Sequence, residues 1–122
     1  MKFERETRAG AKIFTGYGEG YVLINGQRHH HSLIVAPDRL IEWDVASFDV
    51  LREEHFAALA ALEPEIVLLG TGVRLRFPHP RLTQALTAAR IGFEVMDLKA
   101  ACRTYNILVS EDRRVTAALL FE

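Results

Sequence analysis

The most informative stretch of the hydrophobic pattern is residues 66–69, Ile-Val-Leu-Leu, which has no polar alternation. Such a run is typical of a strand that is covered on both faces of a sheet. Gly70-Thr71-Gly72 follows directly, and its glycines let the chain turn with backbone N–H groups exposed at the tip. We therefore expect a central buried strand that ends in a glycine turn.

Beyond the turn, apolar and basic residues alternate. Val73, Leu75 and Phe77 are interleaved with Arg74 and Arg76. A period of two predicts a half-buried extended segment whose two guanidinium groups share one face.

A helical pattern and another strand complete this part of the chain. Apolar residues recur at helical spacing between Pro80 and Gly92. Pro80 suits the first turn of a helix, and Gly92 is expected to close the helix in the C′ position. Residues 93–96 then predict a strand. The unit from 66 to 96 has the length of a right-handed βαβ crossover, so its two strands are predicted to be parallel.

The amino-terminal part predicts a β-hairpin. Asn25-Gly26 is the strongest short hairpin signal and separates residues 21–24 from residues 28–36. The glycine-rich residues 16–20 look at first like a dinucleotide loop, but no buried strand precedes them and no helical pattern follows. A glycine-rich bend is the preferred interpretation there, and residues 40–43 predict a further short strand.

Two more helices and a last strand are expected. Asp49 is a plausible N-cap for a helix stopped by Pro64, and Asp97 can cap a helix that ends at Asn106. Residues 115–121 predict a long buried strand. The apolar stripe of the second helix is predicted to contain Leu98, Ala101, Cys102 and Tyr105.

Length and composition indicate one globular domain. The chain has 122 residues, 49% of them hydrophobic and 25% charged, so we expect a single α/β domain over residues 1–122, with residues 1–12 as a partly ordered arm. Fifteen basic and sixteen acidic residues give a net charge of −1, which disfavours nucleic acid as a partner.

The single cysteine and the absence of a long apolar run bear on location. Cys102 has no intrachain disulfide partner, and no signal-peptide core or stretch of about 20 apolar residues is present. We therefore expect a cytoplasmic protein without membrane insertion.

One region collects residues that suit a small anion. The carboxyl ends of strands in open α/β sheets are common ligand sites, and backbone amides with arginines suit a phosphate or carboxylate. The plain alternative is a connecting turn with surface arginines. Leu75 stands where a dinucleotide fingerprint needs its third glycine, which disfavours nicotinamide and flavin, and no cofactor is predicted. The candidate ligand-binding residues are Gly70, Thr71, Gly72, Arg74, Arg76, Arg103, Thr104 and Asn106.

Two histidines are weak metal candidates. In the predicted hairpin, Val22 faces His29 and Gly20 faces His31, so the two imidazoles share a face. A structural site needs about four ligands, and no carboxylate or cysteine lies nearby in sequence, so a solvated polar face is preferred and no metal is predicted.

No catalytic set is evident. The chain has no Gly-x-Ser-x-Gly elbow and no His-Glu-x-x-His motif. Cys102 lies on an apolar stripe, which predicts a buried thiol rather than a nucleophile. The sequence leans against an enzyme.

Three segments resemble one family: residues 68–77, residues 92–97 and residues 100–108, with Glu111 and Arg113 beyond them. The chain is similar to the small Mth938-like domain shared by bacterial and archaeal proteins, the mitochondrial complex I assembly factor 3 and an adipogenesis-associated protein. The resemblance implies a three-layer α/β fold with a central mixed sheet, helices on one side and an N-terminal hairpin with extra strands on the other. It implies no settled reaction.

Two hypotheses follow. The first is a non-enzymatic interaction or assembly-type domain with a protein partner or a second copy of itself. The alternative is an anion-binding domain or an enzyme with its pocket at Gly70-Thr71-Gly72. An exposed apolar patch would favour the first and a concave pocket at the turn the second.

Overall fold

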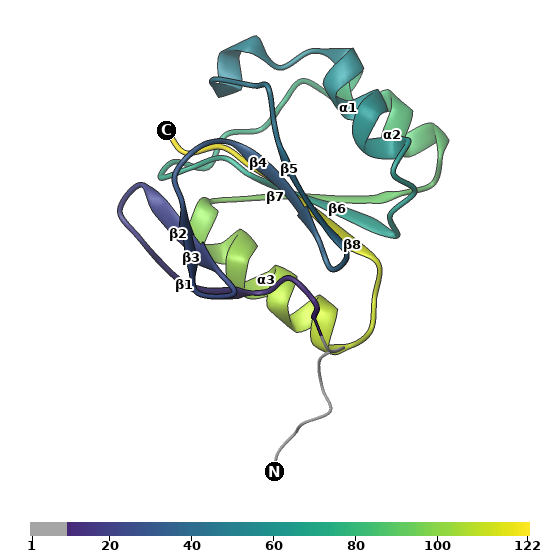
Figure 1. Cartoon of the computed structure of the whole chain (residues 1–122). Coiled ribbons are helices and arrows are strands. Elements are labelled where there is room, and N and C mark those ends of the chain that lie inside the picture. Colours follow the sequence, from purple (N-terminus) through teal and green to yellow (C-terminus); the bar gives the residue numbers. More distant parts are fainter. Residues whose placement is uncertain (1–9) are drawn as a thin grey trace.

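The computed structural model describes residues 10–122 and has a five-stranded mixed sheet at its centre (Figure 1). The strand order is β5-β4-β8-β6-β7, in which β6 is parallel to β7 and β8, and β4 is antiparallel to β5 and β8. The parallel βαβ prediction is therefore confirmed. The strands are β4 (Leu33–Ala36), β5 (Arg39–Glu42), β6 (Ile66–Gly70), β7 (Gly92–Met96) and β8 (Val115–Leu119).

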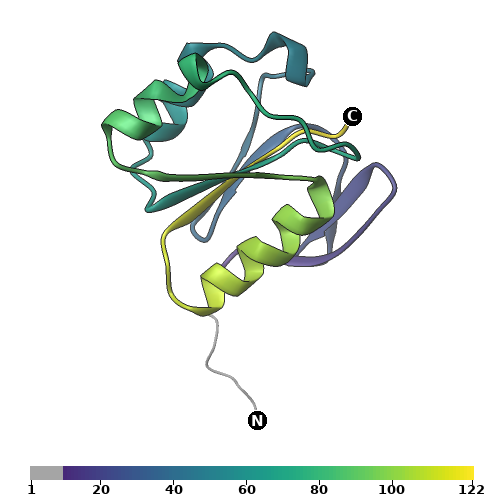
Figure 2. The same ribbon diagram turned by 180° about the vertical axis from the view of Figure 1, so that it is seen from behind.

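One face of this sheet is covered by a second, smaller sheet and the longest helix. The small antiparallel sheet contains β1 (Phe14–Gly18), β2 (Tyr21–Ile24) and β3 (Gln27–His29), and it lies beside α3 (Leu98–Ser110) (Figures 1 and 2). Phe14 of β1 packs edge-on against Tyr105 of α3, with ring centroids 5.1 Å apart.

The other face is covered by short helices. These are the 3-10 turn η1 (Phe48–Val50), α1 (Glu53–Ala60), η2 (Pro80–Thr83) and α2 (Gln84–Ala88). Their buried side chains meet those of the sheet in a second core, which contains Phe56, Leu59, Val67, Leu69 and Leu86.

The three-layer α/β fold is thus confirmed, with one difference in the layers. Helix α3 lies on the same face as the small sheet, not with the other helices (Figure 2). Residues 66–69 need a covering layer on each face of the sheet. Leu68 packs on the face that carries α3, whereas Val67 and Leu69 pack on the face that carries α1 and α2. All three are fully buried, as the apolar run predicts.

The predicted hairpin turn is confirmed, but the predicted length of its second strand, residues 28–36, is wrong, because β3 ends at His29. Asn25 and Gly26 have φ of 49° and 84°, and Val22 pairs with His29. The chain leaves the small sheet after His29, so His31 does not pair with Gly20. Residues 33–36 join the central sheet instead, because all four side chains are buried.

Several helix boundaries also differ from the prediction. Asp49 lies within η1, and α1 begins only at Glu53. Asn106 does not end α3, which continues to Ser110. Gly92 opens β7, and Arg90 with φ 60° occupies the left-handed position after α2.

The predicted arm falls mostly outside the described residues, which exclude 1–9. Within the part described, Lys12 N–H donates to Pro37 O (3.0 Å), and Lys12 O accepts from the Tyr105 hydroxyl (2.8 Å). Among residues 10–122, none of the helices is both long and apolar enough for a membrane span.

Candidate functional site

The Gly70-Thr71-Gly72 turn lies at the carboxyl end of β6, as predicted, but its backbone is largely engaged. Thr71 N–H donates to Met96 O (2.9 Å) and Val73 N–H to Glu122 O (2.9 Å), while Gly72 O accepts from Leu98 N–H (2.8 Å). An anion would need free amides at this place. The turn instead ties β6 to β7, α3 and the segment after β8.

Thr71 organises the segment that follows the turn. The residue is 1% exposed. Its hydroxyl donates to Arg74 O (2.6 Å) and accepts the backbone N–H of Arg76 (3.3 Å between N and Oγ1). Buried hydroxyls need such partners. The role visible for Thr71 is to shape residues 73–77 rather than to contact a ligand.

Arg76 is held by two carboxylates and one aromatic ring. Its guanidinium lies 4.3 Å from the ring centroid of Phe48, and its Nη2 and Nη1 lie 2.7 Å from Asp49 Oδ1 and 3.4 Å from Glu122 Oε1. The Glu122 carboxylate also accepts the N–H of Phe48. Arg76 therefore joins η1, the segment after β6 and the segment after β8.

The exposure of residues 73–77 differs from the prediction: the three hydrophobic residues and Arg74 are exposed, and only Arg76 is turned inward. Val73, Leu75 and Phe77 are 81%, 51% and 69% exposed, whereas the Arg76 side chain is only 27% exposed. The two carboxylates and the Phe48 ring give Arg76 its inward position, which turns the hydrophobic side chains outward. Val50, which is 47% exposed, lies on η1, and Arg76 joins η1 to this segment. We call these four exposed hydrophobic residues, Val50, Val73, Leu75 and Phe77, the apolar surface.

Arg103 and Gly72 line a cavity that is separate from the Arg76 contacts. Together they line a cavity of about 320 Å³ between the β1–β2 turn and the start of α3, with Glu19, Asp97 and Lys99. Arg103 Nη1 donates to the Tyr17 hydroxyl (3.0 Å), and that hydrogen bond is the main cause that raises the pKa of Arg103. The cavity thus carries both signs of charge, and its arginine already has a partner.

Asn106 has a clear structural role. Its Nδ2 donates to Phe14 O (2.7 Å) and its Oδ1 accepts from Phe14 N–H (2.9 Å), which fastens β1 to α3. Thr104 is half-buried on the same helix, and among residues 10–122 its side chain makes no hydrogen bond. Arg74 is exposed and has no ion pair within the described part.

The eight predicted residues are therefore spread over several places. Of these eight, only Gly72 and Arg103 line the cavity near the turn. Their anion-binding role stays a prediction. The sequence missed the apolar surface because the contacts that hold Arg76 inward come from distant segments and leave no signal in the alternation.

The two candidate metal ligands line one cavity but differ in burial, since His29 is half-buried and His31 is exposed. His29 is in β3, and its Nε2 is buried with no hydrogen-bond partner among residues 10–122, whereas the centroid of the His31 ring lies 4.3 Å from that of His30. In the part of the chain that the structure describes, no three His, Cys, Asp or Glu residues are grouped to hold a metal ion.

Cys102 is a buried thiol, as predicted. It is 1% exposed on α3, and burial raises its pKa from 9.0 to about 12. The thiolate is the reactive form, so the folded protein keeps the residue inert.

We expect the stability of the protein to fall between pH 9 and pH 12. The unfolded thiol ionises above its ordinary pKa of 9.0, whereas the folded thiol stays protonated to about 12, so rising pH favours the unfolded chain in this window. Urea denaturation at several pH values measures the effect. A Cys102→Ala variant should have a shallower decline, and an equal decline would contradict this origin.

Comparison with known families gives one match over most of the chain. Residues 14–120 match the model described as protein of unknown function DUF498/DUF598. NADH dehydrogenase [ubiquinone] 1 alpha subcomplex assembly factor 3 of Bos taurus is 34% identical over 119 residues, which are 96% of this chain and 64% of the relative. The chain thus spans somewhat less than two thirds of that protein.

A bacterial relative matches from end to end. The 13 kDa major membrane protein of Francisella tularensis is 27% identical over 122 residues, which cover 98% of this chain and 99% of the relative.

Two solved structures have the same fold. A crystal structure of a Bordetella parapertussis protein has a TM-score of 0.87 at 37% identity and covers 93% of this chain and 98% of that one. A solution structure from Bordetella pertussis, described as a Mth938-like domain, has a TM-score of 0.82 at 31% identity and covers 98% of this chain and 92% of that one.

Proposed function

Because the chain belongs to the DUF498/DUF598 family with its Mth938-like fold, we propose that it is a non-enzymatic domain that binds another protein in an assembly process. Its similarity to a protein named as an assembly factor supports this role. We propose that the partner is a subunit of a multi-subunit complex.

The apolar surface is the observation that carries the proposal. Three large hydrophobic side chains are more than half exposed within five residues, and Val50 lies on the neighbouring turn. Isolated exposed hydrophobic residues are ordinary, but a group of them on one stretch is typical of an interaction site. We infer that Leu75 and Phe77 are the main contacts.

The surface is also held in place before any partner binds. Thr71 fixes the backbone of residues 74 and 76, and Arg76 fastens the segment to Asp49 and Glu122. A preordered segment loses less conformational entropy on association. The exposed guanidinium of Arg74 beside it suits a partner with an apolar patch and an acidic rim.

A capture experiment with matched variants tests the proposal. The tagged full chain, expressed at native abundance in its own organism, is isolated from the aqueous and the detergent-solubilised membrane fractions, and bound proteins are identified by mass spectrometry. The double variant Leu75→Ser/Phe77→Ser should lose the partner. It should fold normally, because substitutions on the surface usually change stability by about 0.5 kcal/mol or less.

Ile107→Ser is the control, because Ile107 is 56% exposed but lies on α3, away from this segment. The control should retain the partner. If both variants retain it, or if the unaltered chain captures no protein, the proposal fails. The two fractions also test the predicted cytoplasmic location, which stays a prediction.

A further inference from the structure

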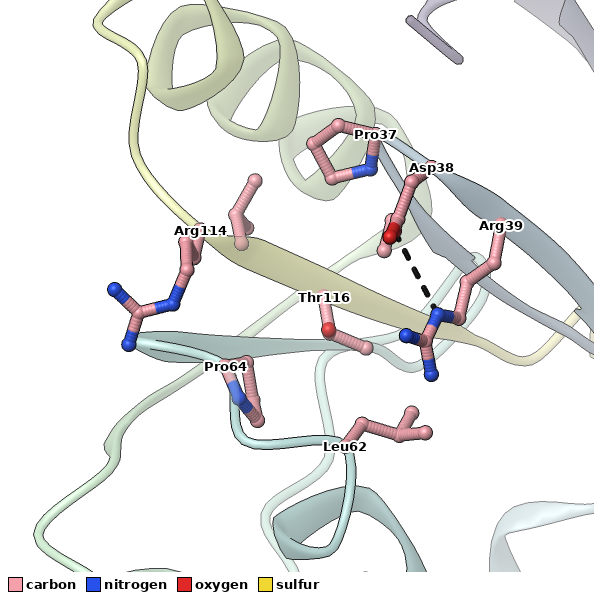
Figure 3. A pocket seen from close by; sticks show the side chains of 9 residues that line it. Pro37, Asp38, Arg39, Leu62, Pro64, Arg114 and Thr116 are labelled. Carbon is pink, nitrogen blue, oxygen red and sulfur yellow. Dashed lines mark ion pairs between the residues drawn. The ribbon is translucent and has the colours of Figure 1, made fainter.

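A second cavity lies at the opposite end of β6 from the glycine turn, where β6 and β8 begin. It has a volume of about 270 Å³, is open to solvent on one side, and is lined by the β4–β5 turn, the loop after α1 and the start of β8 (Figure 3). No residue of the predicted ligand site lines it.

Two arginines at this cavity retain free hydrogen-bond donors. Arg39 Nε lies 3.6 Å from Asp38 Oδ1, which is an ion-pair distance but too long for a hydrogen bond. Within residues 10–122, the Arg114 side chain has neither a hydrogen bond nor an ion pair. Its neighbour Arg113, by contrast, donates twice to Glu65 Oε2, at 3.0 and 2.8 Å.

Thr116 adds a hydroxyl that has no hydrogen-bond partner among residues 10–122. The residue is 3% exposed on β8, and Ala118 and Leu120 on the same face belong to the apolar core. Among the described residues Thr116 and Thr71 are the buried polar ones, and only Thr71 has its hydroxyl hydrogen-bonded. In Figure 3 the Thr116 hydroxyl lies between Arg39 and Arg114 and faces the cavity.

The geometry points to a binding site for a small monocarboxylate with a short apolar chain. A guanidinium offers a planar pair of donors that matches a carboxylate, so we propose that Arg39 holds the carboxylate and that Thr116 donates to it. Leu62, Pro64 and Pro37 form apolar walls for the chain.

Charge and volume select this class of ligand. Arg39 and Arg114 together with Asp38 leave one net positive charge at the cavity, which suits a monoanion better than a dianion such as phosphate. A volume of about 270 Å³ admits a chain of a few carbons but not a nucleotide. Arg114, on the opposite wall from Arg39 in Figure 3, supplies long-range attraction at the rim.

An NMR titration with sodium hexanoate tests the site, with hexylammonium and inorganic phosphate as comparison ligands. Hexanoate should shift the amide signals of Arg39, Arg114 and Thr116, whereas hexylammonium should not. Arg39→Gln should weaken hexanoate binding about tenfold or more, as expected for the loss of a hydrogen bond to a charged group.

Thr116→Val separates binding from folding. The variant should bind hexanoate several-fold more weakly, yet its unfolding temperature should not fall, because the hydroxyl has no hydrogen-bond partner to lose within the described part of the chain. Arg74→Gln, which removes an exposed arginine near the other end of β6, should leave binding unchanged. The proposal is overturned if hexanoate causes no shifts at these amides, if phosphate binds more tightly than hexanoate, or if Arg39→Gln has no effect.

Discussion

Replacing Gly72 by alanine is expected to lower the free energy of unfolding by about 2–4 kcal/mol, since a left-handed backbone and an overpacked side chain each contribute. Gly72 has φ of 88°, and a Cβ atom there would lie 2.1 Å from Glu122 O and 2.9 Å from Glu122 N. Both neighbours are backbone atoms, so no side-chain rotation relieves the contact. Urea denaturation of the variant measures the loss.

The same substitution should weaken partner binding. Glu122 O accepts the N–H of Val73, and the Glu122 carboxylate pairs with Arg76, so a displaced Glu122 releases both ends of the apolar surface. We expect weaker capture of the partner even at temperatures where the variant is folded.

Gly26→Ala is the matched control. Gly26 has φ of 84°, but a Cβ there would have no atom within 4 Å. The control keeps the backbone cost of about 1–2 kcal/mol and lacks the clash. Equal destabilisation by the two substitutions would show that the contact with Glu122 carries no weight.

Asn106→Ala is expected to destabilise the protein by about 2–3 kcal/mol, because hydrogen-bonding groups left without partners in the interior are costly. The variant removes both hydrogen bonds to Phe14, whose N–H and C=O lie between β1 and α3. The small sheet should then open more often. Hydrogen exchange of residues 14–29 should accelerate more than exchange in β6 and β8.

Thr104→Ala on the same helix provides the comparison, because the Thr104 side chain makes no hydrogen bond with any described residue. Its effect should stay within about 0.5 kcal/mol. If Asn106→Ala is equally mild, Asn106 does not fasten the small sheet, and a role at the surface would have to be sought for it.

The element pattern was predictable where one local rule decides. Asp97 accepts the N–H of Ala100 (2.8 Å) as an N-cap, and Asn25-Gly26 supplies the two positive φ angles of a hairpin turn. The predicted helix end at Asn106 is wrong, because α3 continues to Ser110. The Asn106 side chain bonds to β1, a strand 92 residues away, and such a partner leaves no local signal.

The candidate site was less predictable for the same reason. Residues 73–77 alternate in the sequence, but alternation does not say which side chain is buried. In the structure Arg74 is exposed like the hydrophobic residues, and only Arg76 is turned inward. The inward position of Arg76 is set by its contacts with Asp49, Phe48 and Glu122, which lie 27 to 46 residues away in the sequence.

By itself, the sequence determined the α/β class, the parallel crossover and the central place of Ile66–Gly70, because an apolar run without alternation can be satisfied only between two layers. The tertiary structure alone decided that α3 shares a face with the small sheet and that Arg76 turns inward. It also left Arg39, Arg114 and Thr116 around one cavity with free donors. These outcomes depend on contacts between distant segments, whose energies no local pattern records.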